Sequence, residues 1–380
     1  MSNIEWTDET WNPVVGCKEI SPGCRDCYAA KLAHRGLAPQ HRGLTVVRAD
    51  GPHWNGNHRF VADALDKPLH WRKPRKIFPC SMSDLFRDEV SDEEIAAVFG
   101  VMAACPQHTF QVLTKRPERT ERWFEGVQRR ESDGRAVFPH DTAGWRIRQM
   151  LRAAVGRFSG TADPHSSGDA WPLSNVWIGT TCEDQQRADE RLPHLLRVPA
   201  VVRFVSYEPA LGPVDFSPWL PPVFPDIGCR SECGFITRGS GLQCLEGSAC
   251  GRYLHPGDKG HAPVSGFCGR VDKPAIDWLI VGGESGHHAR PLDLAWARQA
   301  VSACKAAGVA CFVKQMGARP VVSEERWWAD GVSIRPGDRP TARARAEDDL
   351  LQLLLRDKKG GDMAEWPEDL RVREFPQVRR

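Results

Sequence analysis

Three cysteines lie close together near the amino-terminal end of the sequence, at Cys17, Cys24 and Cys27. Thiolates with this spacing can hold one metal centre. In an iron–sulfur cube each iron needs a ligand beyond its sulfides, so three cysteines leave one iron open. On zinc, the same trio would need a histidine or a fourth cysteine. A disulfide is the simpler alternative, but three cysteines pair badly and nothing upstream resembles a secretion signal, so the pattern favours a metal.

A second group of cysteines lies further along the chain, among glycine, serine and proline residues. Its members are Cys229, Cys233, Cys244, Cys250 and Cys268. Structural zinc sites usually have paired short spacings, which this group has only loosely. Small loop-rich segments nevertheless need a metal to become ordered, which favours a zinc site within an insertion over residues 226–270. The alternative is a second iron–sulfur cluster, with His255 or His261 as supplementary ligands.

The composition of the 380-residue chain favours a soluble cytoplasmic protein. The formal net charge is +2 and 41% of the residues are hydrophobic, which suffices for one large α/β domain with insertions or for two domains. No apolar run is long enough to span a membrane. The nearly neutral charge argues against a strongly basic nucleic-acid coat, although local basic patches remain compatible with it. Clustered cysteines without a secretion signal are typical of a cytosolic metalloprotein.

Short apolar runs alternate with amphipathic helices along most of the chain. The runs are a first strand within residues 1–16, which includes Val14 and Val15, and then residues 76–80, 109–113, 175–179, 201–205, 277–281 and 310–313. The predicted helices cover residues 28–34, 92–104, 186–196 and 294–307. This rhythm indicates parallel strands covered on both faces. It predicts an α/β fold with a partial or complete parallel (β/α) TIM-like barrel over residues 1–317, interrupted by the Cys-rich metal-binding insertion and followed by a C-terminal extension over residues 318–380.

Polar or charged residues follow the predicted strands. The carboxyl ends of the strands in a parallel barrel form the face where the chemistry takes place. The residues that would meet there, beside the cysteine loop, are Asp84, Lys115, Glu183, Glu208, Glu284 and Lys314. A helix cap is the simpler explanation for Asp84 and Asp184 taken alone. Six such residues in register across successive strands favour a common site.

The remaining cysteines lie in apolar contexts and are expected in the core. They are Cys80, Cys105, Cys182, Cys304 and Cys311. Cys182 differs from the others because it falls at a strand end beside Glu183.

With these features the chain resembles the radical S-adenosylmethionine superfamily, and more closely the phage and bacterial three-Cys-motif proteins of unassigned function. The matching segments are residues 16–29, 83–86, 113–117, 204–209 and 281–286. The resemblance implies a [4Fe–4S] cluster on Cys17, Cys24 and Cys27, with S-adenosylmethionine on the open iron. An electron donor would reduce the cluster, and cleavage of the sulfonium would give a 5′-deoxyadenosyl radical.

The sequence departs from the superfamily pattern in three places. Six residues separate the first two cysteines, where the superfamily usually has three. The residue before the last cysteine is Asp26, where an aromatic residue is usual, and Tyr28 stands just after it. The Gly-Gly-Glu run at 282–284 comes near the end of the barrel instead of after its second strand.

The resemblance also implies roles for residues near the strand ends. Tyr28, Ser83, Asp84 and Glu183 would bind the cofactor, with Ser83 and Asp84 at the ammonium group and Glu183 at a ribose hydroxyl. Lys115, Glu208, Glu284 and Lys314 are the candidate catalytic residues. The simpler alternative is that the two lysines form ordinary salt bridges with Glu208 and Glu284.

Three functions fit the sequence. The first is a radical enzyme acting on nucleic acid or a nucleotide, by analogy with spore photoproduct lyase and because the basic residues within 72–76 and at 115–116 can hold phosphate. The second is a zinc- or iron–sulfur-containing nucleic-acid-binding or partner-docking protein without catalysis, and the third is a regulatory iron–sulfur sensor. The charged strand ends favour the enzyme. Its expected partners are an electron donor, nucleic acid and a dedicated partner protein, with no membrane association.

Overall fold

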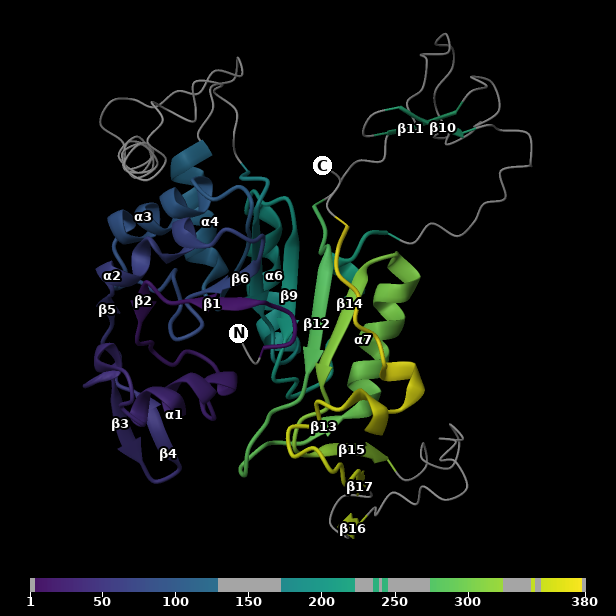
Figure 1. Cartoon of the computed structure of the whole chain (residues 1–380). Coiled ribbons are helices and arrows are strands. Elements are labelled where there is room, and N and C mark those ends of the chain that lie inside the picture. Colours follow the sequence, from purple (N-terminus) through teal and green to yellow (C-terminus); the bar gives the residue numbers. More distant parts are fainter. Residues whose placement is uncertain are drawn as a thin grey trace. The chain divides into compact units, whose positions relative to one another are not determined.

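A sheet of seven parallel strands, curled into a half-barrel, forms the centre of the larger of two units (Figure 1). The structure is a computed structural model that describes residues 4–128, 172–222, 235–238, 241–244, 274–323, 343–345 and 350–377. The larger unit comprises Met1–Leu220 and Ala275–Arg380, and the smaller one comprises Pro221–Pro274. The predicted α/β fold with a parallel TIM-like partial barrel is therefore confirmed.

The strands of the sheet follow one another in chain order. They are β1 (Glu9–Trp11), β6 (Lys76–Pro79), β7 (Thr109–Thr114), β8 (Val176–Thr181), β9 (Arg203–Tyr207), β12 (Trp278–Gly282) and β14 (Ala310–Gln315). Every neighbouring pair in this order is parallel. All the carboxyl ends therefore lie at one edge, which we call the mouth of the half-barrel.

The first strand of the sheet ends before Val14 and Val15. Those two residues form β2 (Val14–Val15), which pairs antiparallel with β5 (Arg59–Phe60) outside the main sheet. The amide oxygen of Asn12 accepts hydrogen bonds from Ser81 Oγ at 3.2 Å and Met82 N at 3.0 Å. The chain leaves the sheet at this point, and Pro13, which lacks an N–H, cannot continue the ladder. The expectation that Val14 and Val15 belong to the first barrel strand was wrong.

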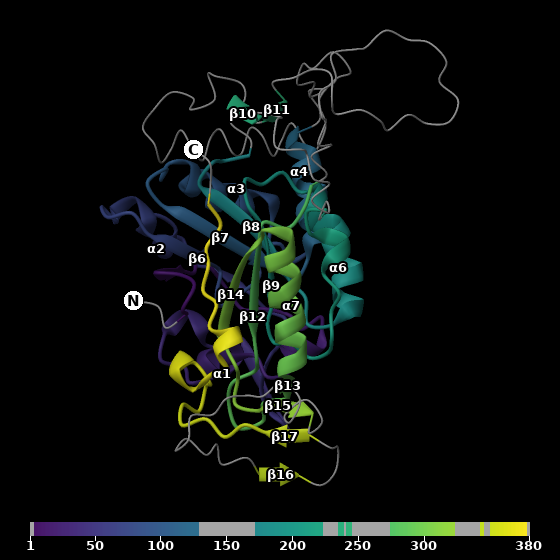
Figure 2. The same cartoon turned by 90° about the vertical axis from the view of Figure 1, so that its right-hand side faces the viewer.

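Four long helices cover the outer face of the sheet (Figures 1 and 2). They are α3 (Asp92–Ala103), α4 (Pro117–Gln128), α6 (Gln185–Arg197) and α7 (Leu294–Ala307). Side chains that accept hydrogen bonds from the first turn begin three of them, namely Ser91, Asp184 and Asp293. These N-caps fix where each helix starts after its strand. The predicted helices are present within two residues of their expected bounds.

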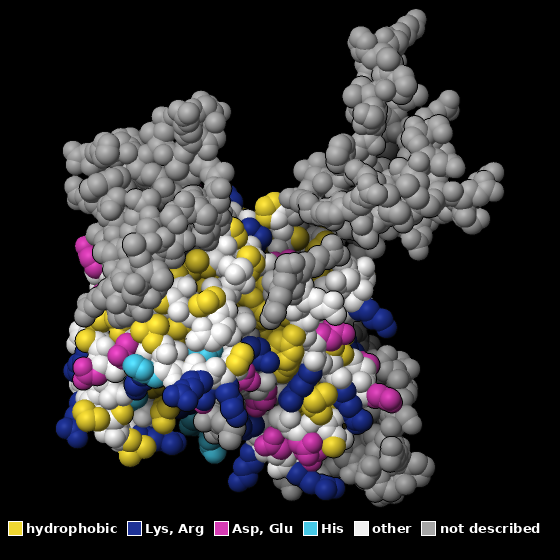
Figure 3. All heavy atoms as spheres, turned by 45° about the horizontal axis from the view of Figure 1, so that its top comes forward, with side chains coloured by type: hydrophobic (Ala, Val, Ile, Leu, Met, Phe, Trp, Pro, Cys, Tyr) yellow, Lys and Arg dark blue, Asp and Glu magenta, His cyan; other side chains and the backbone are white. Residues whose placement is uncertain are grey.

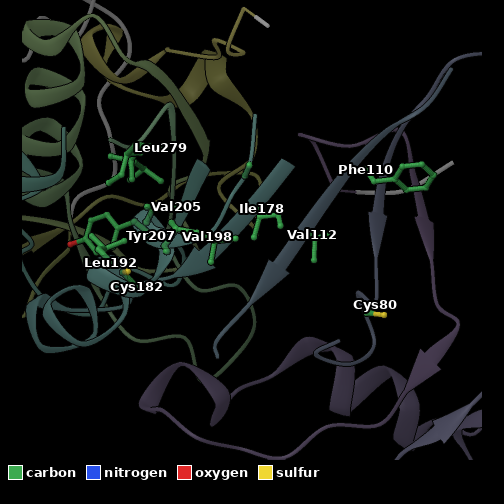
Figure 4. Close-up of a cluster of buried hydrophobic side chains, with 14 of the residues drawn as sticks. Cys80, Phe110, Val112, Ile178, Cys182, Leu192, Val198, Val205, Tyr207 and Leu279 are labelled. Carbon is green, nitrogen blue, oxygen red and sulfur yellow. The ribbon is translucent and has the colours of Figure 1, made fainter. Parts of the chain in front are cut away.

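The core under these helices is aliphatic and aromatic. Figure 4 shows Val112, Ile178 and Val205 on neighbouring strands, with Leu192 of α6 close to Tyr207. All five cysteines predicted to lie in the core are buried. Cys182 belongs to this core, so its thiol does not face the mouth.

The inner face of the curled sheet is aromatic toward the amino ends of its strands. The rings there are Trp6, Phe78, Trp177, Phe204, Trp278 and Phe312. Phe375, near the other end of the chain, packs on Trp278 with ring centroids 5.2 Å apart. Because side chains alternate along a strand, the same face carries Thr181, Ser206, Gly282 and Lys314 toward the mouth. The inside of the half-barrel therefore changes from a packed aromatic layer to a polar mouth.

Smaller elements complete the larger unit. Helix α1 (Tyr28–His34) packs on the antiparallel hairpin β3 (Thr45–Arg48) and β4 (Gly51–Trp54). A further sheet has the order β13 (Leu292–Asp293), β15 (Pro320–Ser323), β17 (Leu350–Gln352) and β16 (Arg343–Arg345). The short helices are α2 (Ala62–Leu65), η1 (Pro22–Cys24), η2 (Pro39–His41), η3 (Lys67–His70), η4 (Ser217–Trp219), η5 (Met363–Glu365) and η6 (Glu368–Leu370).

In the smaller unit the structure describes one antiparallel hairpin, β10 (Phe235–Arg238) and β11 (Gly241–Cys244). Cys244 ends β11. Cys229, Cys233, Cys250 and Cys268, together with His255 and His261, lie outside the described residues. The metal site of this insertion therefore stays a prediction.

Across the parts of the chain that the structure describes, no helix combines the length and the apolar character that crossing a bilayer requires.

Candidate functional site

The three-cysteine loop, residues 16–28, is fixed at its start to the segment that follows β6. Gly16 N donates to Met82 O at 2.9 Å, and Ser83 Oγ donates to Gly16 O at 2.6 Å. The buried Arg87 donates to the same carbonyl at 2.9 Å. Gly16 has a φ of +90°, and a Cβ there would lie 2.4 Å from Asn57 O. Only glycine fits this position, and Ser83 serves here as an anchor of the loop.

Asp84 connects the ends of β6 and β7 to the loop. Its carboxylate accepts hydrogen bonds from Thr114 Oγ1 at 2.7 Å, Lys115 N at 2.9 Å and Arg116 Nη1 at 2.8 Å. Arg116 in turn donates to Lys18 O, beside Cys17, at 3.1 Å. Asp84 therefore orients the arginine that holds the loop backbone. Its predicted contact with the ammonium group of S-adenosylmethionine stays a prediction.

Glu183, after β8, is fully buried and lies at the centre of the loop's contacts. Its Oε1 accepts from Ser21 Oγ at 2.6 Å and pairs with Lys115, and its Oε2 accepts from Arg191 at 2.9 Å. Burial opposes ionisation, but the charges of Lys115 and Arg191 outweigh it and lower the pKa of Glu183. The carboxylate is thus kept charged between two cations, and its predicted contact with a ribose hydroxyl stays a prediction.

Glu284, after β12, reaches the loop through Arg290. Arg290 binds both carboxylate oxygens, from Nη2 at 2.7 Å and Nε at 2.9 Å, and its Nη1 donates to Pro22 O at 2.9 Å. A guanidinium suits this arrangement because its planar fork binds a carboxylate with two donors and leaves a third for the carbonyl. Side chains after β6, β7, β8 and β12 therefore all hold the cysteine loop across the mouth.

Glu208 and Lys314, at the ends of β9 and β14, form a separate ion pair. Their side chains are 16% and 15% exposed. Gly282 leaves room for the pair, because a Cβ there would lie 3.3 Å from the Glu208 side chain. The salt bridge considered for Lys314 is present, whereas Lys115 pairs with Glu183 and Glu284 pairs with Arg290.

Tyr28 directly follows the third cysteine of the loop. Its ring is half exposed, and its hydroxyl donates to Ser81 O at 3.1 Å. Burial of the hydroxyl among protein atoms raises the pKa of the phenol, and the charges of Cys27 and Glu208 raise it further. Tyr28 is therefore near enough to Cys27 and to Glu208 for both charges to act on its hydroxyl.

The three thiols are free, with Cys24 buried and Cys17 and Cys27 partly buried. Burial raises the pKa of Cys17 to about 12, and Asp84 adds to this while Arg116 opposes it. Burial also raises the pKa of Cys27, against the backbone amides of Ala29 and Ala30 and the indole of Trp54. Protons must therefore leave these thiols when a metal binds.

The implied iron–sulfur cluster would need thiolate ligands on this loop. Within the described ranges, no three His, Cys, Asp or Glu side chains are grouped so that they could hold one metal ion. An iron–sulfur cluster places each thiolate on a different iron, so this finding concerns a single ion and not a cluster. Cys24 and Cys27 raise the pKa of Cys17, whereas Arg116 lowers it. Three free thiols on one loop are the kind of donor set that a thiolate-bound cluster would take.

Sequence reasoning missed several residues of this site. Ser21, Arg87, Arg191 and Arg290 were not singled out, although each makes a contact described above. One signal was present for Arg191, which shares the buried face of α6 with Ala188, Leu192 and Leu195. A buried arginine on an apolar face needs a carboxylate partner.

We predict that Arg290→Lys loosens the cysteine loop. Lysine keeps the charge but cannot bind both Glu284 oxygens and Pro22 O together. Losing one or two such hydrogen bonds costs about 1–2 kcal/mol of local stability, so trypsin should cleave after Lys18 or Arg25 about tenfold faster. Arg356→Lys, whose arginine is 96% exposed, is the matched control. Equal cleavage of the loop in both variants would show that Arg290 does not anchor it.

No curated protein and no solved structure matches this chain. A family profile described as "Protein of unknown function (DUF5131)" matches residues 1–349. The matched region contains the cysteine loop, the seven strands of the half-barrel and the residues of the mouth. The chain therefore belongs to the family "Protein of unknown function (DUF5131)".

Proposed function

We propose that this protein is a radical S-adenosylmethionine enzyme. Cys17, Cys24 and Cys27 would hold a [4Fe–4S] cluster, and S-adenosylmethionine would bind beside it. One observation carries the proposal: a loop with three free thiols is held across the mouth of a parallel half-barrel by side chains from four strand ends. That mouth is the face on which parallel barrels carry out their chemistry.

When bound, the reduced cluster would supply the electron that cleaves the sulfonium of S-adenosylmethionine. The residues of the chain have simpler tasks. Arg116 and Arg290 hold the loop backbone on either side of Ser21, and the charge of Arg116 favours the thiolate of Cys17. Glu183 keeps Lys115 and Arg191 in place beneath the loop. Pre-organised loops of this kind fix a reactive group in one orientation.

The Glu208–Lys314 pair is our candidate for contact with the substrate. Both side chains are partly exposed on the inner face, and within the described part of the chain Lys314 is the one hydrogen-bonding partner recorded for the Glu208 carboxylate. The pair can therefore exchange partners at lower cost than the buried Glu183. Lys115 and Glu284, which have strong internal partners, position the loop in this proposal.

The proposed substrate class, a nucleotide or nucleic acid, rests on the sequence. Lys76 begins β6, at the end of the strand opposite the mouth, and Arg72, Lys73 and Arg75 precede it. Arg75 pairs with Glu9. These basic residues are therefore not part of the mouth. The residues of the mouth support binding of the cofactor, and the substrate has to be identified by assay.

The test is to load the protein with iron and sulfide under anaerobic conditions, reduce it with dithionite, add S-adenosylmethionine and measure 5′-deoxyadenosine. We expect product from the wild type and none from Cys24→Ala. Cys105→Ala, which removes a fully buried thiol of the core, is the control and should keep the activity. A fully loaded and reduced wild type that forms no product would refute the proposal and favour the sensor or docking functions.

A further inference from the structure

Trp54, the last residue of β4, belongs to the buried cluster against which two of the three cysteines pack. Its side chain is 4% exposed, and its neighbours in this cluster include Val15, Leu44 and the alanines of α1. The cysteines that pack against the cluster are Cys17 and Cys27. The indole N–H of Trp54 donates a hydrogen bond to the sulfur of Cys27. The β3–β4 hairpin therefore supplies a side-chain donor to one of the thiols of the candidate site.

Contacts that involve no thiol fix this hairpin to the cysteine loop. Glu19, a residue of the loop, lies 2.6 Å from Nδ1 of His53 and accepts a hydrogen bond from Arg48 at 3.0 Å. The His53 ring is almost completely buried, and its Nε2 lies 2.7 Å from Oδ1 of Asp50. These partners hold β4 in place from both sides of the ring. The donor of Trp54 is consequently positioned before any metal binds.

The loop is close to solvent in this part of the molecule. Cys17 and Cys27 are partly exposed, and β3 is exposed from Val46 to Arg48. On the face drawn in Figure 3, Lys, Arg and hydrophobic side chains lie side by side at the lower left, the side on which Figure 1 places α1, β3 and β4. Trp54 could therefore influence a bound cluster in two ways, by donating its N–H to the sulfur or by keeping water away.

These two effects change the reduction potential of a cluster in opposite directions when the tryptophan is altered. A reduced cluster carries one more negative charge than an oxidised one, so hydrogen bonds to its sulfurs stabilise the reduced state more and raise the potential. Access of water also favours the more highly charged, reduced state. Loss of the N–H donor would therefore lower the potential, whereas loss of shielding from water would raise it.

We infer that Trp54 is a positioning residue that makes the proposed cluster easier to reduce, by donating its indole N–H to the sulfur of Cys27. The inference rests on the proposed function, because it concerns the cluster on Cys17, Cys24 and Cys27. Trp54 acts on the cluster through its ligand and needs no contact with S-adenosylmethionine.

The test is a potentiometric titration of the loaded protein with dithionite, followed by electron paramagnetic resonance. Trp54→Phe keeps an aromatic ring and removes the N–H. We expect the equilibrium constant for one-electron reduction to fall about tenfold, a shift of about 59 mV to more negative potential, because one hydrogen bond to a charged group is worth about that factor.

The matched control is Trp6→Phe. Trp6 is 2% exposed and lies in the aromatic layer toward the amino ends of the strands. Its indole nitrogen has no hydrogen-bond partner within the described part of the chain. This variant loses the same atoms from a buried site and should keep the wild-type potential. Iron content and thermal unfolding show whether both variants are loaded and folded.

A second measurement uses the wild-type chain and does not depend on the folding of a variant. Tryptophan labelled with a heavy isotope at the indole nitrogen should give a weak coupling to the unpaired spin of the reduced cluster. Trp6→Phe should keep this coupling and Trp54→Phe should lose it. A coupling that is absent from the wild type would contradict the hydrogen bond directly.

The possible failures can be told apart. Equal potentials in the two variants, or a shift of Trp54→Phe to more positive potential, would refute the inference alone if the wild type forms 5′-deoxyadenosine. The expected shift and coupling in a protein that forms no 5′-deoxyadenosine would refute the proposed enzyme activity alone. A protein that takes up no cluster would refute both.

Discussion

Replacing Cys17, Cys24 or Cys27 by alanine is expected to lower the iron content of the reconstituted protein from about four atoms per chain to nearly none. Each cysteine would be the ligand of a different iron, and a cluster with two protein ligands is readily lost. Arg116, Arg290 and Ser21 hold the loop from several sides, so its backbone cannot shift to bring in a substitute. The broad absorbance at about 400 nm that is typical of thiolate-bound clusters should disappear together with the iron.

The measurement is iron, sulfide and zinc analysis after anaerobic purification, with Cys105→Ala as the control for loss of a buried thiol. Cys229→Ala and Cys233→Ala, in the insertion, are expected to leave the iron largely in place and to lower stability or zinc content. If the first three variants kept full iron while these two lost it, the two cysteine groups would have to exchange their assigned roles.

The strands of the half-barrel could be predicted because burial on both faces leaves a direct trace in the sequence. Runs such as 277–281 and 310–313 are continuously apolar, and the covering helices alternate apolar and polar residues. The same logic placed Glu183, Glu208 and Glu284 at one mouth, since parallel strands carry their carboxyl ends to one side. It was wrong for Val14 and Val15, because a short edge strand of mixed polarity, Glu9–Trp11, gives no such pattern.

The partners of the charged residues could not be predicted, because they are set by distance in space. Arg290 and Pro22 are 268 positions apart in sequence, and Ser21 and Glu183 are 162 apart. No local pattern specifies which carboxylate will meet which cation. The β3–β4 hairpin is a further case, because it forms where Leu44 and Trp54 pack under α1. That packing depends on tertiary contact more than on intrinsic strand preference.

Glu183→Gln is expected to cause the largest loss of stability among single changes at the mouth, about 3 kcal/mol of unfolding free energy. The amide has nearly the same shape but cannot balance the charges of Lys115 and Arg191. Arg191 is almost completely buried, so its unpaired charge cannot regain water, whereas Lys115 is partly exposed and can in part do so. The hydrogen bond from Ser21 is also weakened, so the cysteine loop should become easier to cleave with trypsin.

The matched control is Glu190→Gln, the same substitution on the exposed side of α6. Glu190 pairs with Arg187 in water, and such surface pairs contribute at most about 1 kcal/mol. Chemical unfolding in urea, analysed by linear extrapolation, measures both variants against the wild type. Equal small losses in the two variants would mean that Lys115 and Arg191 find other partners and that Glu183 is not the centre of the site.

The loss of stability caused by Glu183→Gln should also depend on pH. The lowered pKa of Glu183 determines in which direction this loss changes with pH. A glutamate whose pKa is lower in the folded than in the unfolded chain stabilises the fold above its unfolded value of about 4.3. That contribution is lost as the pH falls from this value through the folded pKa. The difference in stability between wild type and variant should therefore be full at pH 7 and shrink progressively below about pH 4. A difference that stayed constant into that range would show that the ion pairs with Lys115 and Arg191 are not its source.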